Sequence, residues 1–271
     1  MSDPTYVTKA KQALSLGKKI LFLEGIDDEA VYTKWLEKLD PLFAARLEII
    51  DCEGQQKVSK GLALLGNPPN VFGIQDRDEW DSAQIAAMQA AHPRLFVNPD
   101  RHTLESYCCD PQEITLALLN QDPATFGPQV NQLTAEITAG LADWVDHGAL
   151  WTSLMRVQNA MQEAKLPHFF NQIVPIPPDA TIRTRMQQWR TIVDDVDMFA
   201  AFAALRTHAR SQTQSKQLQS CVYAPLFFTA VVLPKLQQLQ PSDERTWKVN
   251  LAEWSPNPPP DVVPLLQAVL A

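Results

Sequence analysis

Two stretches of the chain decide its fold: LFLEGIDDEAVY at residues 21–32 and VFGIQDRDEWD at residues 71–81. Each begins with a short apolar run, which is typical of a buried β-strand, and then changes abruptly to acidic residues. The first run, KKILFLEG at 18–25, predicts a strand that ends in a carboxylate. The apolar residues that follow recur at helical spacing and predict an amphipathic helix over 28–39.

The same alternation continues on both sides of the second stretch. Apolar runs predict further strands at 47–50, 71–74 and 94–97. Between them, apolar residues at helical spacing predict two helices, one through Val58 and Leu62 and one through Ile85 and Met88. Strands that alternate with helices indicate an α/β fold, with a mostly parallel sheet flanked by helices.

The pattern changes to long helical stretches after about residue 111. We predict helices over 129–164, 183–210 and 216–240, and a last one over 262–270 behind a proline-rich spacer. The sequence therefore predicts two domains. Residues 1–115 form the sheet domain, and residues 116–271 form a mainly α-helical C-terminal domain.

Composition limits the function classes. The chain has 271 residues, a net charge of −8 and 20% charged residues. A protein that merely coats nucleic acid needs an excess of Lys and Arg, so this class is disfavoured. An enzyme that meets a phosphodiester through a bound cation is not excluded, because the ion supplies positive charge locally.

Sequence signals for other chemistry are missing. The four cysteines have no zinc-ligand spacing and predict reduced, buried thiols. No P-loop, GxGxxG or GxSxG motif occurs. We find no export signal and no apolar stretch long enough to span a bilayer, so we expect a soluble, cytoplasmic protein.

Three carboxylates follow apolar strands. Glu24 continues the first strand, and Asp76 and Asp78 follow the strand at 71–74. The carboxyl ends of parallel strands meet at one edge of a sheet, where α/β folds bind ligands. Three converging carboxylates without His or Cys favour Mg²⁺ or Mn²⁺. A structural alternative is equally open, because acidic residues after strands also cap helices, as Asp27 and Asp28 would.

These segments resemble a known family. LFLEGIDDEAVY, the turn DCEGQQKV at 51–58 and VFGIQDRDEWD look like the Glu motif, glycine turn and DxD motif of the TOPRIM fold. RHTLESYCCDP at 101–111 looks like a further segment of OLD-like TOPRIM proteins. The combination is most similar to stand-alone OLD-like TOPRIM nucleases without a fused ATPase, of the type of the TOPRIM effector of the PARIS anti-phage system.

The resemblance implies roles for individual residues. It makes Glu24, Asp76 and Asp78 catalytic metal ligands, and it makes Asp28 a ligand for a second ion. Glu105 matches a downstream catalytic glutamate. With these residues, the family cleaves phosphodiesters by a two-metal mechanism.

The basic residue that such nucleases place near the scissile phosphate is not evident. Lys57, Arg101 and His102 are the candidates for contacting substrate, although an ordinary surface or structural role suits each of them as well. Where relatives carry a Gly-Lys pair, this chain has Ala224 and Pro225. This departure leaves catalytic activity less supported than metal binding.

The sequence therefore predicts a Mg²⁺- or Mn²⁺-dependent nuclease that acts on DNA or RNA, tRNA included, in anti-phage or mobile-element defence. The alternative is a catalytically weak TOPRIM subunit or binding module that acts through an ATPase partner protein. Self-association into a homo-oligomer is compatible with both functions.

Overall fold

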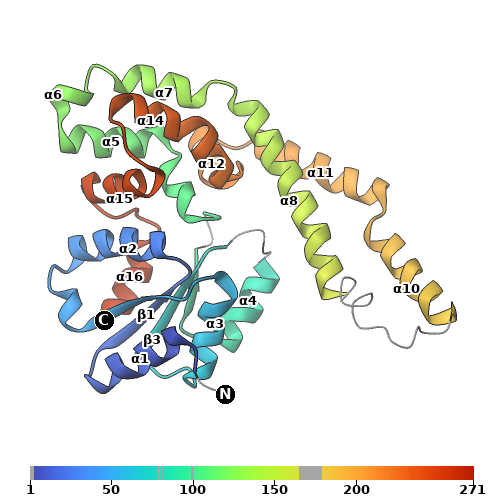
Figure 1. The fold of residues 1–271 in the computed structure, drawn as a ribbon. Helices are drawn as coiled ribbons and strands as arrows, with labels where there is room; N and C mark the ends of the chain where they lie inside the picture. Colours follow the sequence, from blue (N-terminus) through green and yellow to red (C-terminus); the bar gives the residue numbers. More distant parts are fainter. Residues whose placement is uncertain (1–2, 78–79, 81, 99–100, 165–178) are drawn as a thin grey trace. The chain divides into compact units, whose positions relative to one another are not determined.

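The computed structural model describes residues 3–77, 80, 82–98, 101–164 and 179–271 (Figure 1). The chain forms two compact units. The first unit comprises Met1–Ala139, Leu218–Ser220 and Ala224–Ala271, and the second comprises Gly140–Gln217 and Cys221–Tyr223. The predicted boundary at residue 115 lies inside the first unit, to which the last helices of the chain return.

A parallel β-sheet forms the centre of the first unit, as the alternation of strands and helices predicted. Within the described residues it has four strands in the order β2-β1-β3-β4. Their bounds are β1 Lys19–Leu23, β2 Leu47–Asp51, β3 Val71–Gln75 and β4 Leu95–Val97. All pairs are parallel, so the residues that follow the strands lie at one edge of the sheet.

Alternating side chains of the strands pack into two separate cores. Ile20 and Phe22 belong to the core beneath three helices: α1 Thr5–Ser15, α3 Gln55–Leu64 and α4 Ser82–Ala91. Leu21 and Leu23 belong to the opposite core, beneath α2 Ile26–Leu39 and the C-terminal α16 Val263–Leu270. The sheet is therefore covered on both faces.

Gly73 allows α3 to pack close to the sheet. A Cβ atom at this position would lie 2.7 Å from Cγ1 of Val58 and 3.2 Å from Cδ1 of Leu62. Both neighbours are fully buried side chains of α3. The glycine in the strand is therefore required by the helix that crosses it.

The remaining elements of the first unit are short. They are the 3₁₀ helices η1 Phe43–Ala45 and η2 Leu104–Cys108, the π-helical turn η3 Phe228–Val232, and the α-helices α5 Pro111–Gln121, α6 Pro123–Phe126, α7 Val130–Thr138, α13 Ala224–Phe227, α14 Leu233–Leu239 and α15 Glu244–Trp254. The helix predicted over 129–164 is interrupted at Gly140, whose φ of +71° ends α7 and starts a new helix. Helices α1, α5 and α15 were not predicted.

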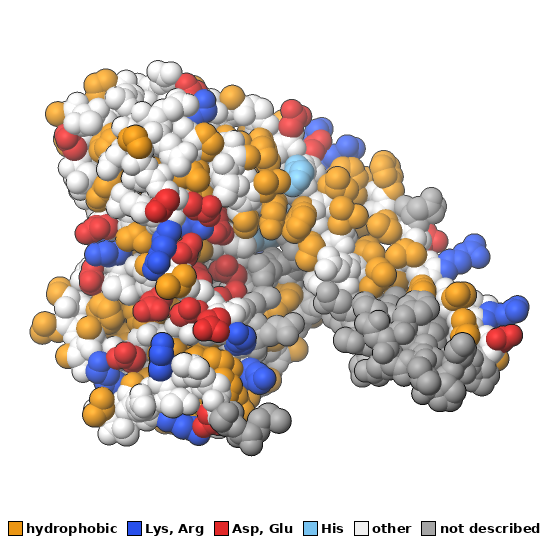
Figure 2. Space-filling model, viewed as in Figure 1, with side chains coloured by type: hydrophobic (Ala, Val, Ile, Leu, Met, Phe, Trp, Pro, Cys, Tyr) orange, Lys and Arg blue, Asp and Glu red, His pale blue; other side chains and the backbone are white. Residues whose placement is uncertain are grey.

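The second unit is built from α8 Leu141–Glu163, α10 Asp179–Ile192 and α11 Asp195–Arg210, followed by the start of α12 Gln214–Ser220. Helix α8 packs along α11, and Arg210 Nε donates to Asp146 Oδ1 at 2.7 Å. Figure 2 shows hydrophobic side chains gathered over these two helices. Leu154 and Phe199 are among the exposed ones.

Among the described helices, none alone combines the length and the hydrophobicity needed to cross a bilayer, although the sharply bent pair Gln214–Ser220 and Ala224–Leu239 meets both criteria when taken together.

Truncation of a buried residue of α16 tests whether the C-terminal helix completes the core of the sheet. Leu266 is fully buried, so Leu266→Ala should lower the free energy of unfolding by about 2–5 kcal/mol. Leu42→Ala removes the same atoms from a side chain that is 77% exposed and serves as the control. Equal costs for the two variants in urea denaturation would contradict the packing of α16.

Candidate acidic site at the edge of the sheet

Glu24 and Asp76 lie together at the carboxyl edge of two neighbouring strands. Strand β1 ends at Leu23 and β3 ends at Gln75, so both acidic residues come directly after their strands. The carboxylate oxygen Oε1 of Glu24 accepts a hydrogen bond from the backbone N–H of Asp76 at 2.8 Å. The third predicted ligand, Asp78, lies outside the described residues.

Asp76 also connects this edge to the segment that carries Glu105. Its Oδ2 atom accepts a hydrogen bond of 3.3 Å from the backbone N–H of Leu104, the first residue of η2. Glu105 is the next residue along the chain. The structure therefore brings the 101–111 segment to the same edge of the sheet as Glu24 and Asp76.

Asp28 has the structural role that the sequence left open. Its carboxylate accepts a hydrogen bond of 2.9 Å from the N–H of Gly25 and so caps the start of α2. The chain bends between β1 and α2 at Gly25, whose φ of −144° is extended backbone that any residue adopts. A Cβ atom on Gly25 would lie 3.3 Å from Oδ2 of Asp28, so the glycine makes room for this carboxylate.

The carboxylates influence one another electrostatically. Burial raises the pKa of Asp28 to about 7, and the negative charge of nearby Glu105 adds to the effect. Burial also raises the pKa of the Tyr32 phenol, and the charges of Asp76 and Asp28 contribute. Tyr32, on α2, therefore lies close to carboxylates from several separate segments.

Lys248 is a functional candidate that the sequence analysis missed. Only 3% of its side chain is exposed, and its Nζ atom lies 2.7 Å from Glu105 and 2.7 Å from Glu244. Asp27 lies 3.5 Å from the same atom. Burial alone would lower the pKa of Lys248, but the charges of Glu105 and Glu244 more than offset that and raise it.

A weak sequence signal for Lys248 was present. It lies on α15 between the buried residues Trp247, Leu251 and Ala252, so a cation occupies the apolar side of an amphipathic helix. Buried lysines are rare unless they are paired. Because α15 is remote in sequence from the acidic motifs, no motif spacing connects the two.

Acidic and basic side chains alternate on the surface near this lysine. Figure 2 shows red and blue side chains side by side over the region of α2 and α15. The pairs there include Lys34 with Glu253 at 3.5 Å and Arg245 with Asp27 at 3.5 Å. These exposed pairs add little stability individually.

Arg101, one of the predicted substrate contacts, is bound by protein groups. It is 4% exposed, forms a bidentate pair with Glu113, and donates to Asp261 at 3.1 Å. Its guanidinium also lies 4.2 Å from the ring centroid of Tyr107. Arg101 therefore connects the chain before η2 to Glu113 on α5 and to Asp261, which precedes α16.

The other two predicted substrate contacts are more accessible. Lys57 lies 3.5 Å from Glu53, an exposed pair, and lines a cavity of about 170 Å³ together with Lys9 and Lys60. The cavity lies beside Asp51, the last residue of β2, and therefore at the carboxyl edge of the sheet. His102 is partly buried in the stretch that precedes η2.

The chemistry of the donors fits a hard divalent cation, but their spacing does not form a ligand shell. Glu24, Asp28, Asp76 and Glu105 offer only oxygen, the preferred donor of Mg²⁺ and Mn²⁺. Among the described residues, no three carboxylate, His or Cys side chains are grouped closely enough to hold an ion. Protein groups hold them instead: backbone N–H groups bind Glu24 and Asp28, and Lys248 binds Glu105.

The buried thiols of Cys52 and Cys108 are poor nucleophiles. Burial raises the pKa of the thiols of Cys52 and Cys108 to about 12, so both remain protonated at neutral pH.

Comparison with known proteins adds no assignment. No protein-family model matches this chain, and no curated protein shows significant similarity to it.

The raised pKa of Asp28 predicts a pH dependence of stability. The folded state favours the protonated form of the Asp28 carboxyl group. In metal-free buffer, the free energy of unfolding should therefore fall as the pH rises from about 4 through about 7. The side chain of Asp28→Asn is neutral at every pH. We therefore expect the variant at pH 8 to be more stable than wild type, with a free energy of unfolding higher by on the order of 1–2 kcal/mol.

The variant should lose this advantage below pH 4, where wild-type Asp28 is protonated. Asp40→Asn is the control, because Arg46 holds the pKa of Asp40 below its usual value and its removal gives no gain. Urea denaturation at both pH values measures the difference. A destabilised Asp28→Asn at pH 8 would show that the hydrogen bond to Gly25 outweighs the charge.

Removal of the Lys248 charge should expose the repulsion among its partners. Lys248→Met keeps the apolar stem but leaves Glu105 and Glu244 without their buried cation, so we expect a loss of about 3–5 kcal/mol. Lys34→Met, at a more exposed lysine on the neighbouring helix, should cost less than about 1 kcal/mol. Adding Glu105→Gln to Lys248→Met should recover part of the loss, and strict additivity would argue against the coupling.

Proposed function

We propose that the chain is a Mg²⁺- or Mn²⁺-dependent nuclease of the OLD-like TOPRIM type, acting on DNA or RNA in cytoplasmic defence against phage or mobile elements. One observation carries the proposal. The Glu24 carboxylate reaches the backbone of Asp76 at 2.8 Å, so acidic residues from two separate strands lie at one point of the sheet edge. The α/β crevice at this edge is where ligands of such folds bind.

Glu24, Asp76, Asp78 and Asp28 would hold the cations. When bound, Mg²⁺ or Mn²⁺ supplies a water of lowered pKa and compensates charge on the leaving oxygen. The raised pKa of Asp28 supports this assignment, because a carboxylate placed near other carboxylates gains from a neighbouring cation. The Asp28 carboxylate would keep its hydrogen bond from the N–H of Gly25, because its remaining lone pairs can bind a cation.

The remaining groups would orient the substrate. Lys248 holds the Glu105 carboxylate at 2.7 Å and fixes its position beside the acidic residues. Lys57, with Lys9 and Lys60, lines the cavity at the end of β2 and offers positive charge to backbone phosphates. In a chain of net charge −8, such local lysines are needed for a polyanion to approach.

The second candidate function is a catalytically weak TOPRIM subunit or binding module that acts through an ATPase partner protein, with or without self-association. The observation that favours it is the set of protein groups that already bind Glu24, Asp28 and Glu105. A site whose carboxylates stabilise the fold can be retained after loss of metal affinity.

Incubation with plasmid DNA, single-stranded DNA and tRNA in the presence of Mn²⁺ or Mg²⁺ tests the proposal. Wild type should cleave at least one of these substrates, and Asp76→Asn should slow the cleavage by roughly 100-fold or more, since one lost ligand removes several kcal/mol of transition-state stabilisation. Asp122→Asn is the matched control, because Asp122 caps α6 away from the site and asparagine caps equally well.

Binding of Mn²⁺, followed by electron paramagnetic resonance, separates the two candidate functions. Cleavage accompanied by Mn²⁺ binding, both dependent on Asp76, supports the nuclease, whereas the absence of both supports the catalytically weak subunit. Cleavage that is undiminished in Asp76→Asn would overturn the assignment of the site.

A further inference from the structure

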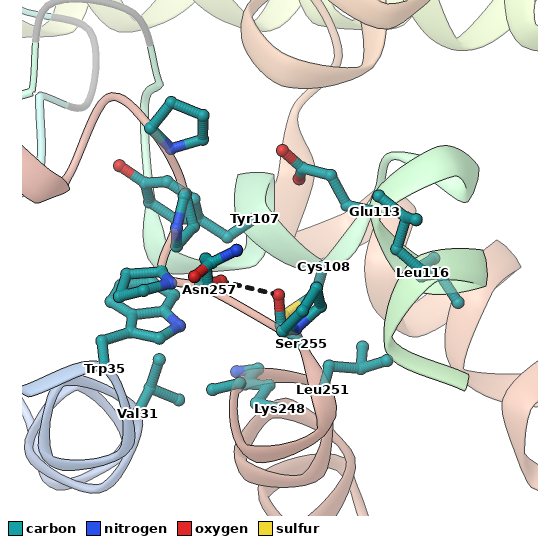
Figure 3. Close-up of a pocket in the computed structure, with 16 residues that line it drawn as sticks. Val31, Trp35, Tyr107, Cys108, Glu113, Leu116, Lys248, Leu251, Ser255 and Asn257 are labelled. Carbon is teal, nitrogen blue, oxygen red and sulfur yellow. Dashed lines mark hydrogen bonds between the residues drawn. The ribbon is translucent and has the colours of Figure 1, made fainter. Parts of the chain in front are cut away.

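A cavity of about 300 Å³ lies within the first unit, between α2, η2, α5 and α15 (Figure 3). Trp35 and Tyr107 lie on one side of the space in this view, and Leu116 lies on the other. Four prolines at 256 and 258–260 form a further wall. Most of the lining is therefore apolar, as in small-molecule sites, whose volumes begin at about this size.

The segment Ser255–Pro260, here called the proline strap, is fixed at both ends. At one end Asn120 donates to the carbonyl of Trp254 at 2.7 Å, and Lys38 donates to that of Ser255 at 2.6 Å. At the other end Asp261 accepts from Asn98 at 2.8 Å and from Arg101 at 3.1 Å. Prolines restrict the backbone further. The cavity wall is thus held in place without a ligand.

The two charged side chains that line the cavity are already paired. Lys248 lies 2.7 Å from both Glu105 and Glu244. Glu113 accepts from the buried guanidinium of Arg101 at 2.9 Å. A charged ligand would lose its hydration in this cavity and would find no unpaired opposite charge to compensate for that loss. Its binding would therefore be costly in free energy. An uncharged ligand avoids this cost.

We infer that this cavity binds a small, uncharged ring compound. The prolines and Leu116, which is 57% exposed, offer apolar surfaces to the ring of the ligand, and the parts of Trp35 and Tyr107 that line the cavity close its base. Ser255 Oγ donates to the carbonyl of Asn257 at 2.8 Å (Figure 3), which leaves the hydroxyl oxygen of Ser255 as an acceptor and the side-chain amide of Asn257 for one hydroxyl or amide of the ligand.

A ligand in this cavity would contact two residues, Lys248 and Trp35, that also contact residues of the acidic site. Lys248 lines the cavity and holds Glu105, and Trp35 packs edge-on against Tyr32 at 5.0 Å. Tyr32 in turn lies among the carboxylates that raise its pKa. The binding itself depends on neither nuclease activity nor a metal.

Isothermal titration with 2-naphthol, an uncharged ring with one hydroxyl, tests the inference in metal-free buffer without nucleic acid. We expect saturable binding at one site, and binding at least 10-fold weaker for 2-naphthalenesulfonate, which adds a full charge to the same rings. Leu116→Trp narrows the cavity from a position that is 57% exposed, so the fold should persist while 2-naphthol affinity falls at least 10-fold.

Leu42→Trp makes the same substitution at an exposed position that does not line this cavity, and it should bind like wild type. Circular dichroism and thermal melts establish that each variant is folded. The inference is overturned by absence of saturable 2-naphthol binding, by equal affinity for the sulfonate, or by a folded Leu116→Trp that binds as tightly as wild type. Because no catalysis is measured, these outcomes are distinct from a failure of the proposed nuclease function.

Discussion

The parallel pairing of β1 with β3 is the constraint on which the rest of the structure depends. It places Phe22 opposite Gly73, so both strands end at the same level and Glu24 meets the backbone of Asp76. Asp76 in turn accepts a hydrogen bond from the backbone N–H of Leu104, the first residue of η2. This contact connects the edge of the sheet to the segment that carries Glu105. One register in the sheet thereby sets the positions of acidic residues from three segments far apart in the sequence.

A single buried lysine compensates much of the negative charge that this register brings together. Lys248 contacts Asp27, Glu105 and Glu244, while Asp28 lies close enough to Glu105 for its pKa to rise. One cation does not neutralise this many carboxylates. The local excess of negative charge is therefore a property of the folded chain, and it adds to the cost that burial imposes on ionising Asp28.

Much of the fold could be predicted from the sequence, because strand–helix alternation is a local signal. All four strands were found, with β1 predicted two residues too long at its end, at Glu24 and Gly25. The convergence of Glu24 with Asp76 followed from parallel topology. Lys248 could not be found in this way, since its partners depend on how α15 packs against α2. The packing of α16 on the sheet could not be predicted either. Hydrophobic periodicity identifies the apolar face of a helix, but it does not identify the surface that this face covers.

The return of the chain to its own sheet has a consequence for biosynthesis. Leu266 and Val269 of α16 are fully buried against the same core as Leu21 and Phe72, yet many helices separate α16 from the strands along the chain. Until α16 emerges from the ribosome, one side of the nascent sheet lacks part of its cover, and its apolar side chains are open to association with other chains. The sheet therefore cannot complete its core until α16 has been synthesised.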